Sequence, residues 1–309
     1  MTTYRTDLAV ESGVMDAPIE GVSTEEYRVC GIEIYSVEIR TEEAARRMGK
    51  PIGRYVTLSD ERLSSADIAE KDGLADAIRQ TVFEMLPPSG DVLVVGLGNR
   101  KITADALGSR VLENLLVTRH MKSVTRDALS GRLRGVCAVA PGVLGVTGLE
   151  TAEVVKGILE RARPAAVIAI DALAARETRR IGTTLQITDT GIRPGSGVGN
   201  HRMGLTRETL GVPVLALGVP MVVYASVIAR DALSLLFQDL AIDESSHAEA
   251  VDALIRKVAR EPLGDLVVTP REVDDMVGRI AFVIAEGLNR ALQPKLSKEE
   301  ITSYSHESL

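Results

Sequence analysis

The sequence predicts an α/β fold of three layers, in which helices cover both faces of a mainly parallel sheet. Through the middle of the chain, segments that are apolar along their whole length alternate with amphipathic helical segments. Strands of that kind are covered on both faces, which is typical of parallel sheets with helices on each side. The length of 309 residues, with 45% hydrophobic and 26% charged residues, is ordinary for a globular protein that buries a large core.

The N-terminal part of the chain predicts an arm followed by two strands and two helices. The first thirty residues are polar and acidic, so they are expected to lie outside the core. The segment CGIEIYSVEIR, which starts at Cys30, predicts a strand whose apolar alternation changes phase, as at a bulge. A short helix follows, capped by Thr41 and ended by Gly49. The second strand is RYVTL at 54–58, and an amphipathic helix is expected over 64–86.

The rest of the chain repeats a strand–helix unit. Strands are expected at 91–98, 135–140, 165–170, 183–189 and 213–219. Helices are expected at about 104–120, 149–163 and 222–240, and the third strand is followed by a short helix-like segment, DALAARETRR. The C-terminal region adds two helices, of which the second begins with a capping box at Thr269 and ends near Leu292.

Composition and charge argue against several classes of protein. A net charge of −7, 3% aromatic residues and no Trp are unlike a nucleic-acid-binding protein. The N-terminus lacks the apolar stretch of a secretion signal. The uncharged segment 211–229 is interrupted by Pro213, Gly218 and Pro220, so it predicts a buried strand, a turn and the start of a helix. We therefore expect a soluble, cytoplasmic protein that does not enter membranes.

The cysteines and histidines do not predict a metal site. Cys30 and Cys137 have apolar neighbours and are expected to be small buried residues in a reducing compartment. The four histidines lack metal-ligand spacing, and GLGNRK lacks the third glycine of a dinucleotide fingerprint. The chain has neither a P-loop nor a GxSxG motif. No metal and no cofactor are expected, and carboxylates are the expected catalytic groups if the protein is an enzyme.

Acidic side chains follow several of the predicted strands. In open parallel sheets, ligands bind outside the carboxyl ends of the strands, where the loops converge. Asp105 follows the first central strand together with Asn99 and Thr103, and Asp171 follows the third strand directly. Because neighbouring strands bring these loops to one edge of the sheet, Asp105 and Asp171 are the two carboxylates best placed to meet.

Each of these carboxylates also has a purely structural interpretation. Asp105 lies near the start of a predicted helix, where a negative charge opposes the helix dipole. Asp171 fits the cap of the next helix, although a carboxylate at the tip of a buried strand is costly unless it is paired or used. Asp189 fits a turn before Gly191. The loop PGSGVGN at 194–200 fits either an anion-binding nest or a flexible connection, of which the flexible connection is the more common use of such a sequence.

Long motifs throughout the chain carry a family resemblance. They are RTDLAVE (5–11), GRYVTL (53–58), VVGLGN (94–99), ADALG (104–108), ENLLVTRH (113–120), APGVLGVTGLET (140–151), VIAIDALAAR (167–176), TTLQITDTGIRPGSGVGN (183–200), ETLGVPVLALGVP (208–220) and VVTPREVDDMV (267–277). With these motifs the chain resembles the germination protease family, spore endopeptidases that degrade small acid-soluble spore proteins when spores germinate. The fold of that family is distantly similar to the hydrogenase-maturation endopeptidases.

The resemblance implies a reaction, a precursor form and an assembly. Two aspartates act in the family, and their motifs fall here on Asp105 and Asp171. Family members are zymogens that cut themselves within the RTDLA motif, which places the bond between Asp7 and Leu8. Residues 1–7 would then be a propeptide that is similar to the substrate cleavage site, and 8–309 a single peptidase domain with additional N-terminal strands and C-terminal helices. The resemblance also implies a homotetramer in the forespore or spore core.

A two-carboxylate mechanism is expected, with Asp105 as the base because its position at a helix start favours the charged form, and Asp171 as the acid. The sequence departs from the family motifs at Ala104, Ser109 and Tyr224, none of which is one of the two aspartates.

Two other hypotheses stay open. One is a metal-assisted peptidase that uses Asp105 or Asp171 as a ligand, although the sequence has no suitably placed His to act beside it. The other is a non-catalytic scaffold that binds spore proteins.

Overall fold

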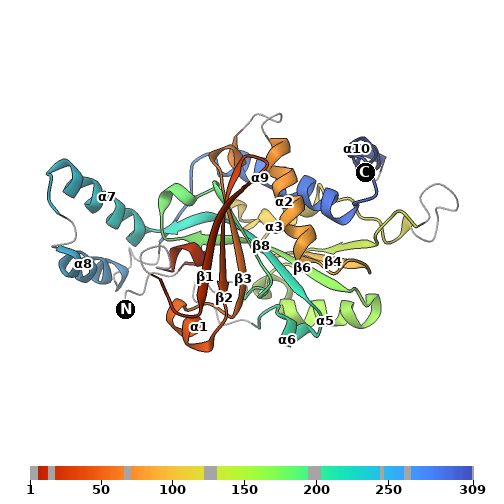
Figure 1. Cartoon of the computed structure of the whole chain (residues 1–309), viewed down its shortest axis with the longest axis horizontal. Helices are drawn as coiled ribbons and strands as arrows, with labels where there is room; N and C mark the ends of the chain where they lie inside the picture. Colours follow the sequence, from red (N-terminus) through yellow and green to blue (C-terminus); the bar gives the residue numbers. More distant parts are fainter. Residues whose placement is uncertain are drawn as a thin grey trace.

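A single sheet of nine strands runs through the molecule (Figure 1). The computed structural model describes residues 6–12, 18–65, 71–121, 131–193, 203–243, 247–260 and 266–307. The strand order is β1-β2-β3-β7-β8-β6-β4-β5, and β9 pairs with β8. The strands are β1 Val22–Val29, β2 Ile32–Ile39, β3 Gly53–Ser59, β4 Val92–Gly96, β5 Val136–Val139, β6 Ala166–Ala175, β7 Thr184–Thr188, β8 Val214–Tyr224 and β9 Val267–Val268.

The α/β fold is confirmed, and its sheet is mixed. The strands β5, β4, β6 and β8 pair in parallel, as the apolar central segments predict. The N-terminal strands and β7 extend this parallel core with antiparallel pairs, and β7 joins the two parts by pairing with β3 on one side and β8 on the other. The antiparallel half was not visible in the sequence, because alternation within a strand does not reveal the direction of its partner.

Helices cover both faces of the sheet. On one face α2, α3 and α9 pack against the strands in the largest apolar cluster, which includes Ile78, Val111 and Ile284. On the other face α5 and α6 form a second cluster with β4 and β6. The helices are α1 Glu42–Met48, α2 Lys71–Met85, α3 Leu107–Leu112, α4 Leu144–Thr147, α5 Thr151–Ala162, α6 Arg207–Leu210, α7 Ala225–Asp239, α8 Ala248–Arg260, α9 Val273–Leu292 and α10 Lys298–Glu307.

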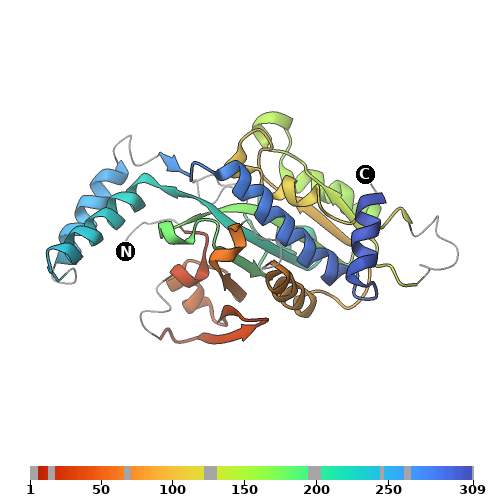
Figure 2. The same ribbon diagram turned by 90° about the horizontal axis from the view of Figure 1, so that it is seen from above.

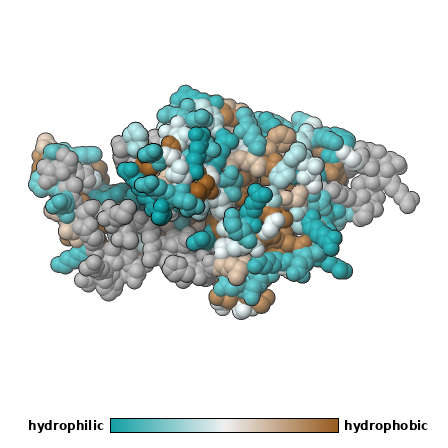
Figure 3. All heavy atoms as spheres, turned by 60° about the horizontal axis from the view of Figure 1, so that its bottom comes forward, coloured by the Kyte–Doolittle hydropathy of each residue, from teal (hydrophilic) through white to brown (hydrophobic). Residues whose placement is uncertain are grey.

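The helices α7 and α8 form a pair that extends away from the body of the molecule (Figures 1 and 2). The face shown in Figure 3 is largely hydrophilic, with smaller groups of hydrophobic residues between the charged ones. Among the described residues, no helix combines the length and the apolar character that crossing a bilayer requires.

The predicted phase change in β2 is present without a bulge. The strand pairs with β1 and β3 in a continuous register over its whole length. Ile32 and Ile34 belong to the large cluster that also includes α2 residues, whereas Val37 and Ile39 belong to a separate cluster that includes Met48 of α1. One strand therefore contributes to two cores on opposite faces. The helix α1 itself is as predicted, because the Thr41 hydroxyl accepts from the Ala44 N–H and Gly49 ends the helix in a left-handed conformation.

The arm interpretation of the first thirty residues is wrong for the part that the structure describes. Residues 22–29 form β1, and Leu8, Ala9 and Val10 are buried. The prediction that Cys30 is buried is also wrong. Cys30 is exposed, because it forms the tight turn from β1 to β2 with φ of 51° beside Gly31. Cys137 is only half-buried.

Several predicted element boundaries also need correction. The helix expected at 104–120 is the 3-10 turn η3, Thr103–Asp105, followed by the short α3. The turn expected at Gly218–Pro220 lies inside β8, where the register with β6 shifts opposite Pro220 and accommodates its missing N–H. The Thr269 hydroxyl donates to the Met221 carbonyl and does not cap α9. The additional helix α10 follows Pro294, which ends α9.

Candidate active site

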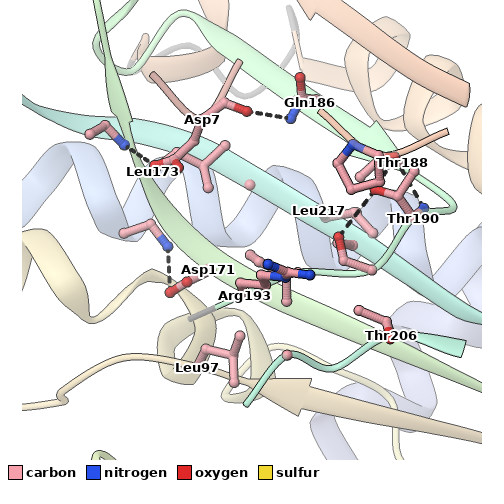
Figure 4. Close-up of a pocket in the computed structure, with 18 of the residues that line it drawn as sticks. Asp7, Leu97, Asp171, Leu173, Gln186, Thr188, Thr190, Arg193, Thr206 and Leu217 are labelled. Atoms are coloured by element: carbon pink, nitrogen blue, oxygen red, sulfur yellow. Dashed lines mark hydrogen bonds between the residues drawn. The ribbon is translucent and has the colours of Figure 1, made fainter. Parts of the chain in front are cut away.

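A large pocket opens at the carboxyl end of the parallel strands. Its volume is about 1600 Å³, and Asp105 and Asp171 both line it. Asp7, Leu173 and Gln186 also line it, so the pocket joins the ends of β4 and β6 to the N-terminal segment and to β7 (Figure 4). The two carboxylates that the strand-end argument selected, 66 residues apart in the sequence, therefore line one pocket.

Asp105 is positioned by the loop that leaves β4. Gly98 turns the chain with φ of +92°, and a Cβ at this position would lie 1.8 Å from the Asp105 carbonyl oxygen. The close approach lets the Asn99 N–H donate to Asp105 Oδ2 over 2.8 Å. A backbone donor of this kind stabilises a carboxylate, as it would at a helix cap. Glycine at position 98 is therefore required for the placement of the carboxylate.

Asp171 lies inside β6 and not at a helix start. The strand continues to Ala175, so the prediction that DALAAR is helix-like and that Asp171 caps it is wrong. Pairing between β4 and β6 ends at Gly96 and Ile170, and Leu97 N–H donates to the Ile170 carbonyl. Asp171 is thus the first β6 residue beyond its neighbour β4. Its side chain is 7% exposed, and Oδ1 accepts from the Ala172 N–H over 3.0 Å.

The segment 6–12 occupies the same pocket. The Asp7 N–H donates to the Ala174 carbonyl of β6 over 3.1 Å, and the Ala174 N–H donates to Asp7 Oδ2 over 2.9 Å. Gln186 of β7 holds the main chain of the segment at Asp7 and Ala9. Because β8 lies between β6 and β7 in the sheet, residues 7–9 cross the face of β8.

Leu8 anchors this segment through its side chain. It is fully buried in an apolar cluster with Val10, Leu173, Ala175, Val223 and Val227. Gly218 makes room for this cluster, because a Cβ there would lie 2.5 Å from Leu173 Cγ. Burying a leucine side chain contributes about 1.5–3 kcal/mol, so Leu8 is a major part of the docking energy.

Charged groups hold both ends of the segment. The Lys50 ammonium donates to the Thr6 carbonyl over 2.8 Å, and burial lowers the pKa of Lys50. Glu11 accepts from the Arg176 N–H over 2.9 Å and from the Thr6 hydroxyl, and it pairs with Arg180 at 3.2 Å. Burial is the main cause that raises the pKa of Glu11, and the contacts with Thr6, Arg176 and Arg180 oppose it.

The other residues that the sequence singled out have structural roles. Asp189 lines the pocket, but its Oδ1 accepts from the Arg54 N–H over 2.8 Å, which fits the turn interpretation. Asn99 Oδ1 accepts from the Lys101 N–H, and the Thr103 hydroxyl donates to Asp274. The loop at 194–200 lies outside the described residues. Within the described ranges, no three His, Cys, Asp or Glu side chains gather in a way that could hold a metal ion.

Gln186 and Lys50 are pocket residues that sequence reasoning missed. Gln186 is buried, but it lies in the segment TTLQITD among other polar residues, so no local pattern distinguished it. Tyr55 also lines the pocket, and burial raises its pKa to about 12. Lys50 had no signal, since a lysine after a helix is ordinarily exposed.

An α/β sheet with two carboxylates in a pocket beyond its parallel strands is an arrangement suited to hydrolysis. Comparison with known proteins identifies the class more closely. The family model described as germination protease matches residues 5–256 and 242–305. The chain belongs to the germination protease family, and it is an endopeptidase.

The relatives are similar over nearly the full length. A germination protease of Clostridium perfringens (strain ATCC 13124) is 42% identical over 323 residues, covering 98% of this chain and 99% of the relative. Germination proteases of Caldanaerobacter subterraneus subsp. tengcongensis and Bacillus subtilis (strain 168) are 43% and 40% identical, each over 98% of this chain and over 98% and 96% of the relatives. A solved [NiFe] hydrogenase maturation protease, HycI from Thermococcus kodakarensis KOD1, is 19% identical over 46% of this chain and 80% of its own, with a TM-score of 0.29.

Proposed function

We propose that this endopeptidase degrades small acid-soluble spore proteins during spore germination, and that it is made as a zymogen that removes its own residues 1–7. The family names support a role in germination. The observation that carries the zymogen proposal is the docked segment: residues 7–9 lie across β6 and β7 in the pocket that Asp105 and Asp171 line. A segment in that place blocks access for other chains.

The proposed chemistry uses the two aspartates as a base and an acid. In this proposal the two carboxylates lie close enough to repel, so one keeps its proton while the other stays ionised. The Asn99 N–H stabilises a charged Asp105, and burial disfavours charge on Asp171. Asp105 therefore takes a proton from the water that attacks the peptide carbonyl, and Asp171 donates its proton to the leaving amine.

Cleavage between Asp7 and Leu8 would sever the segment that crosses the pocket, and departure of the new N-terminus from the Leu8 cluster would then open the pocket to substrates. The peptidase domain then comprises residues 8–309, with Leu8 as its new N-terminus. A substrate with an acidic residue followed by a leucine, like Asp7 and Leu8, would present its leucine to the same apolar cluster. By analogy with the family, the active form is a homotetramer in the forespore or spore core.

Intact-mass and N-terminal analysis of the purified full chain tests this proposal. We expect the loss of residues 1–7 to leave Leu8 at the N-terminus, and the processed chain to cleave a purified small acid-soluble spore protein. A processed chain with a different N-terminus would contradict the assigned bond. A processed chain that leaves the spore protein intact would contradict the substrate and favour the scaffold hypothesis.

A further inference from the structure

The side chain of Gln186 makes two hydrogen bonds to the docked segment, one with each end of its amide. Gln186 Nε2 donates to the Asp7 carbonyl oxygen over 3.0 Å (Figure 4), and Gln186 Oε1 accepts from the Ala9 N–H over 2.7 Å. The residue is 6% exposed, so both bonds form away from bulk water. A buried amide is costly unless both of its ends are satisfied, and here the main chain of residues 7–9 satisfies them.

These two bonds reproduce the pairing of a β-strand. In a parallel sheet, the N–H of a residue donates to the carbonyl of the residue that precedes its partner on the neighbouring strand. The carbonyl of the same residue accepts from the N–H of the residue that follows that partner. The Gln186 amide does the same on either side of Leu8, whose backbone is extended with φ of −85° and ψ of 130°. The interaction involves only main-chain atoms of the segment. It would therefore hold any extended chain in this register, whatever its side chains.

The register of the sheet places this amide on the same face as one of the aspartates. Gly218 of β8 pairs with Asp171 of β6 on one side and with Gln186 of β7 on the other. Residues directly opposite one another project from the same face of a sheet, and two strand spacings separate the Cα atoms of Asp171 and Gln186 by roughly 10 Å. Both side chains line the pocket.

We propose that Gln186 is a catalytic residue of this peptidase, which aligns the substrate main chain and donates a hydrogen bond to the carbonyl of the bond that is cut. This inference rests on the proposed cleavage between Asp7 and Leu8, since Gln186 Nε2 contacts the carbonyl of that bond. A neutral amide suits the role, because it supplies a donor and an acceptor in a fixed geometry.

The step balances with water as the only co-reactant. The water oxygen bonds to the Asp7 carbonyl carbon while one water proton moves to the ionised aspartate. The carbonyl π electrons move to the oxygen, and this negative charge is stabilised by the N–H that Gln186 donates. The carbon–nitrogen bond then breaks, the protonated aspartate gives its proton to the Leu8 nitrogen, and the products are a carboxyl group on Asp7 and a free amine on Leu8.

A purely anchoring role for Gln186 predicts a different behaviour. If the amide only held the segment in an inhibitory position, its loss would release the segment and leave cleavage as fast as before, or faster. If the amide acts on the carbonyl, its loss slows cleavage. The variant Gln186→Met separates the two roles because it removes both bonds. The variant Gln186→Glu, assayed at a pH at which its carboxyl group is ionised, keeps an acceptor for the Ala9 N–H but has no donor for the Asp7 carbonyl.

The experiment measures the rate at which the full chain loses residues 1–7, by intact mass over time. Thr188→Val is the matched control, since Thr188 lies on the same face of β7 and lines the pocket, but its hydroxyl bonds to Thr190. Circular dichroism establishes that each variant is folded. Removing a donor to a developing oxyanion typically lowers the rate by about 10²–10³-fold.

We expect both Gln186 variants to lose residues 1–7 at least about 100-fold more slowly than the wild type, and Thr188→Val to remain within about threefold of it. Wild-type rates or faster processing in folded Gln186→Met would overturn the inference while leaving the proposed function intact. A wild-type chain that is never cut between Asp7 and Leu8 would overturn both, so the two failures are distinguishable.

Discussion

Truncation of Leu8 tests whether the N-terminal segment is docked by its apolar side chain. Leu8 is fully buried against Leu173, Ala175, Val223 and Val227. Replacing a leucine in such a site with alanine costs about 2–5 kcal/mol, through lost burial and the cavity left behind. The cost falls on the docked state alone, because the pocket walls belong to a sheet that persists without the segment. The ratio of docked to undocked segment should therefore fall by about 30-fold or more, at 1.4 kcal/mol for each factor of ten.

Hydrogen–deuterium exchange of residues 6–12 measures this ratio. The Ala9 N–H is bonded to Gln186, so its exchange requires the segment to leave the pocket. Leu8→Ala should speed exchange of this amide by about 30-fold or more, in an Asp171→Asn background that keeps residues 1–7 attached. Leu235→Ala is the control, since Leu235 is 63% exposed on α7. Unchanged protection in Leu8→Ala would refute the docking argument.

Three further predictions concern charge, backbone geometry and metals. Burial raises the pKa of Glu11 above its ordinary 4.5, so docking of the N-terminal segment should be strongest below pH 4.5 and weaken as the pH rises through the raised pKa. Glu11→Gln should abolish this pH dependence of docking in hydrogen–deuterium exchange measurements. Gly98→Ala should displace Asp105 and slow the loss of residues 1–7 by at least about tenfold, whereas Gly145→Ala should not, because open space surrounds Gly145. Equal processing rates in the two variants would refute the argument that Gly98 positions Asp105. Chelation with EDTA should leave the processing rate unchanged, and a loss restored by zinc would favour the metal-assisted alternative.

The parallel core and the position of its site could be predicted from the sequence. Strands that are apolar throughout must be covered on both faces, and the loops at their carboxyl ends must converge. These two rules placed Asp105 and Asp171 at one edge, and both line the same pocket. The catalytic roles of the two residues remain predictions.

The continuation of β6 past Asp171 could not be predicted from local pattern. The residues DALAA favour a helix by intrinsic propensity. Pairing with β8 as far as Ala175 and Val223 overrides that preference, although β4 no longer accompanies β6 there. Tertiary context decided the structure of this segment.

The burial of the N-terminal segment was missed for a similar reason. Its acidic residues suggested an exposed arm, but Asp7 is bonded to Ala174, and Glu11 to Arg176 and Arg180, all more than 160 residues away in the sequence. No local pattern shows that such distant partners exist. The same holds for Gln186, whose partners lie in that segment.

Substitution of the two aspartates tests the central claim most directly. Asp105→Asn and Asp171→Asn keep the size of each side chain and remove its ability to act as an acid or base, whereas Asp189→Asn changes a third carboxylate that lines the same pocket. The rate of loss of residues 1–7 should fall by at least about 100-fold in each of the first two variants and stay near the wild-type rate in the third. Processing at the wild-type rate in folded Asp105→Asn or Asp171→Asn would contradict the two-aspartate mechanism.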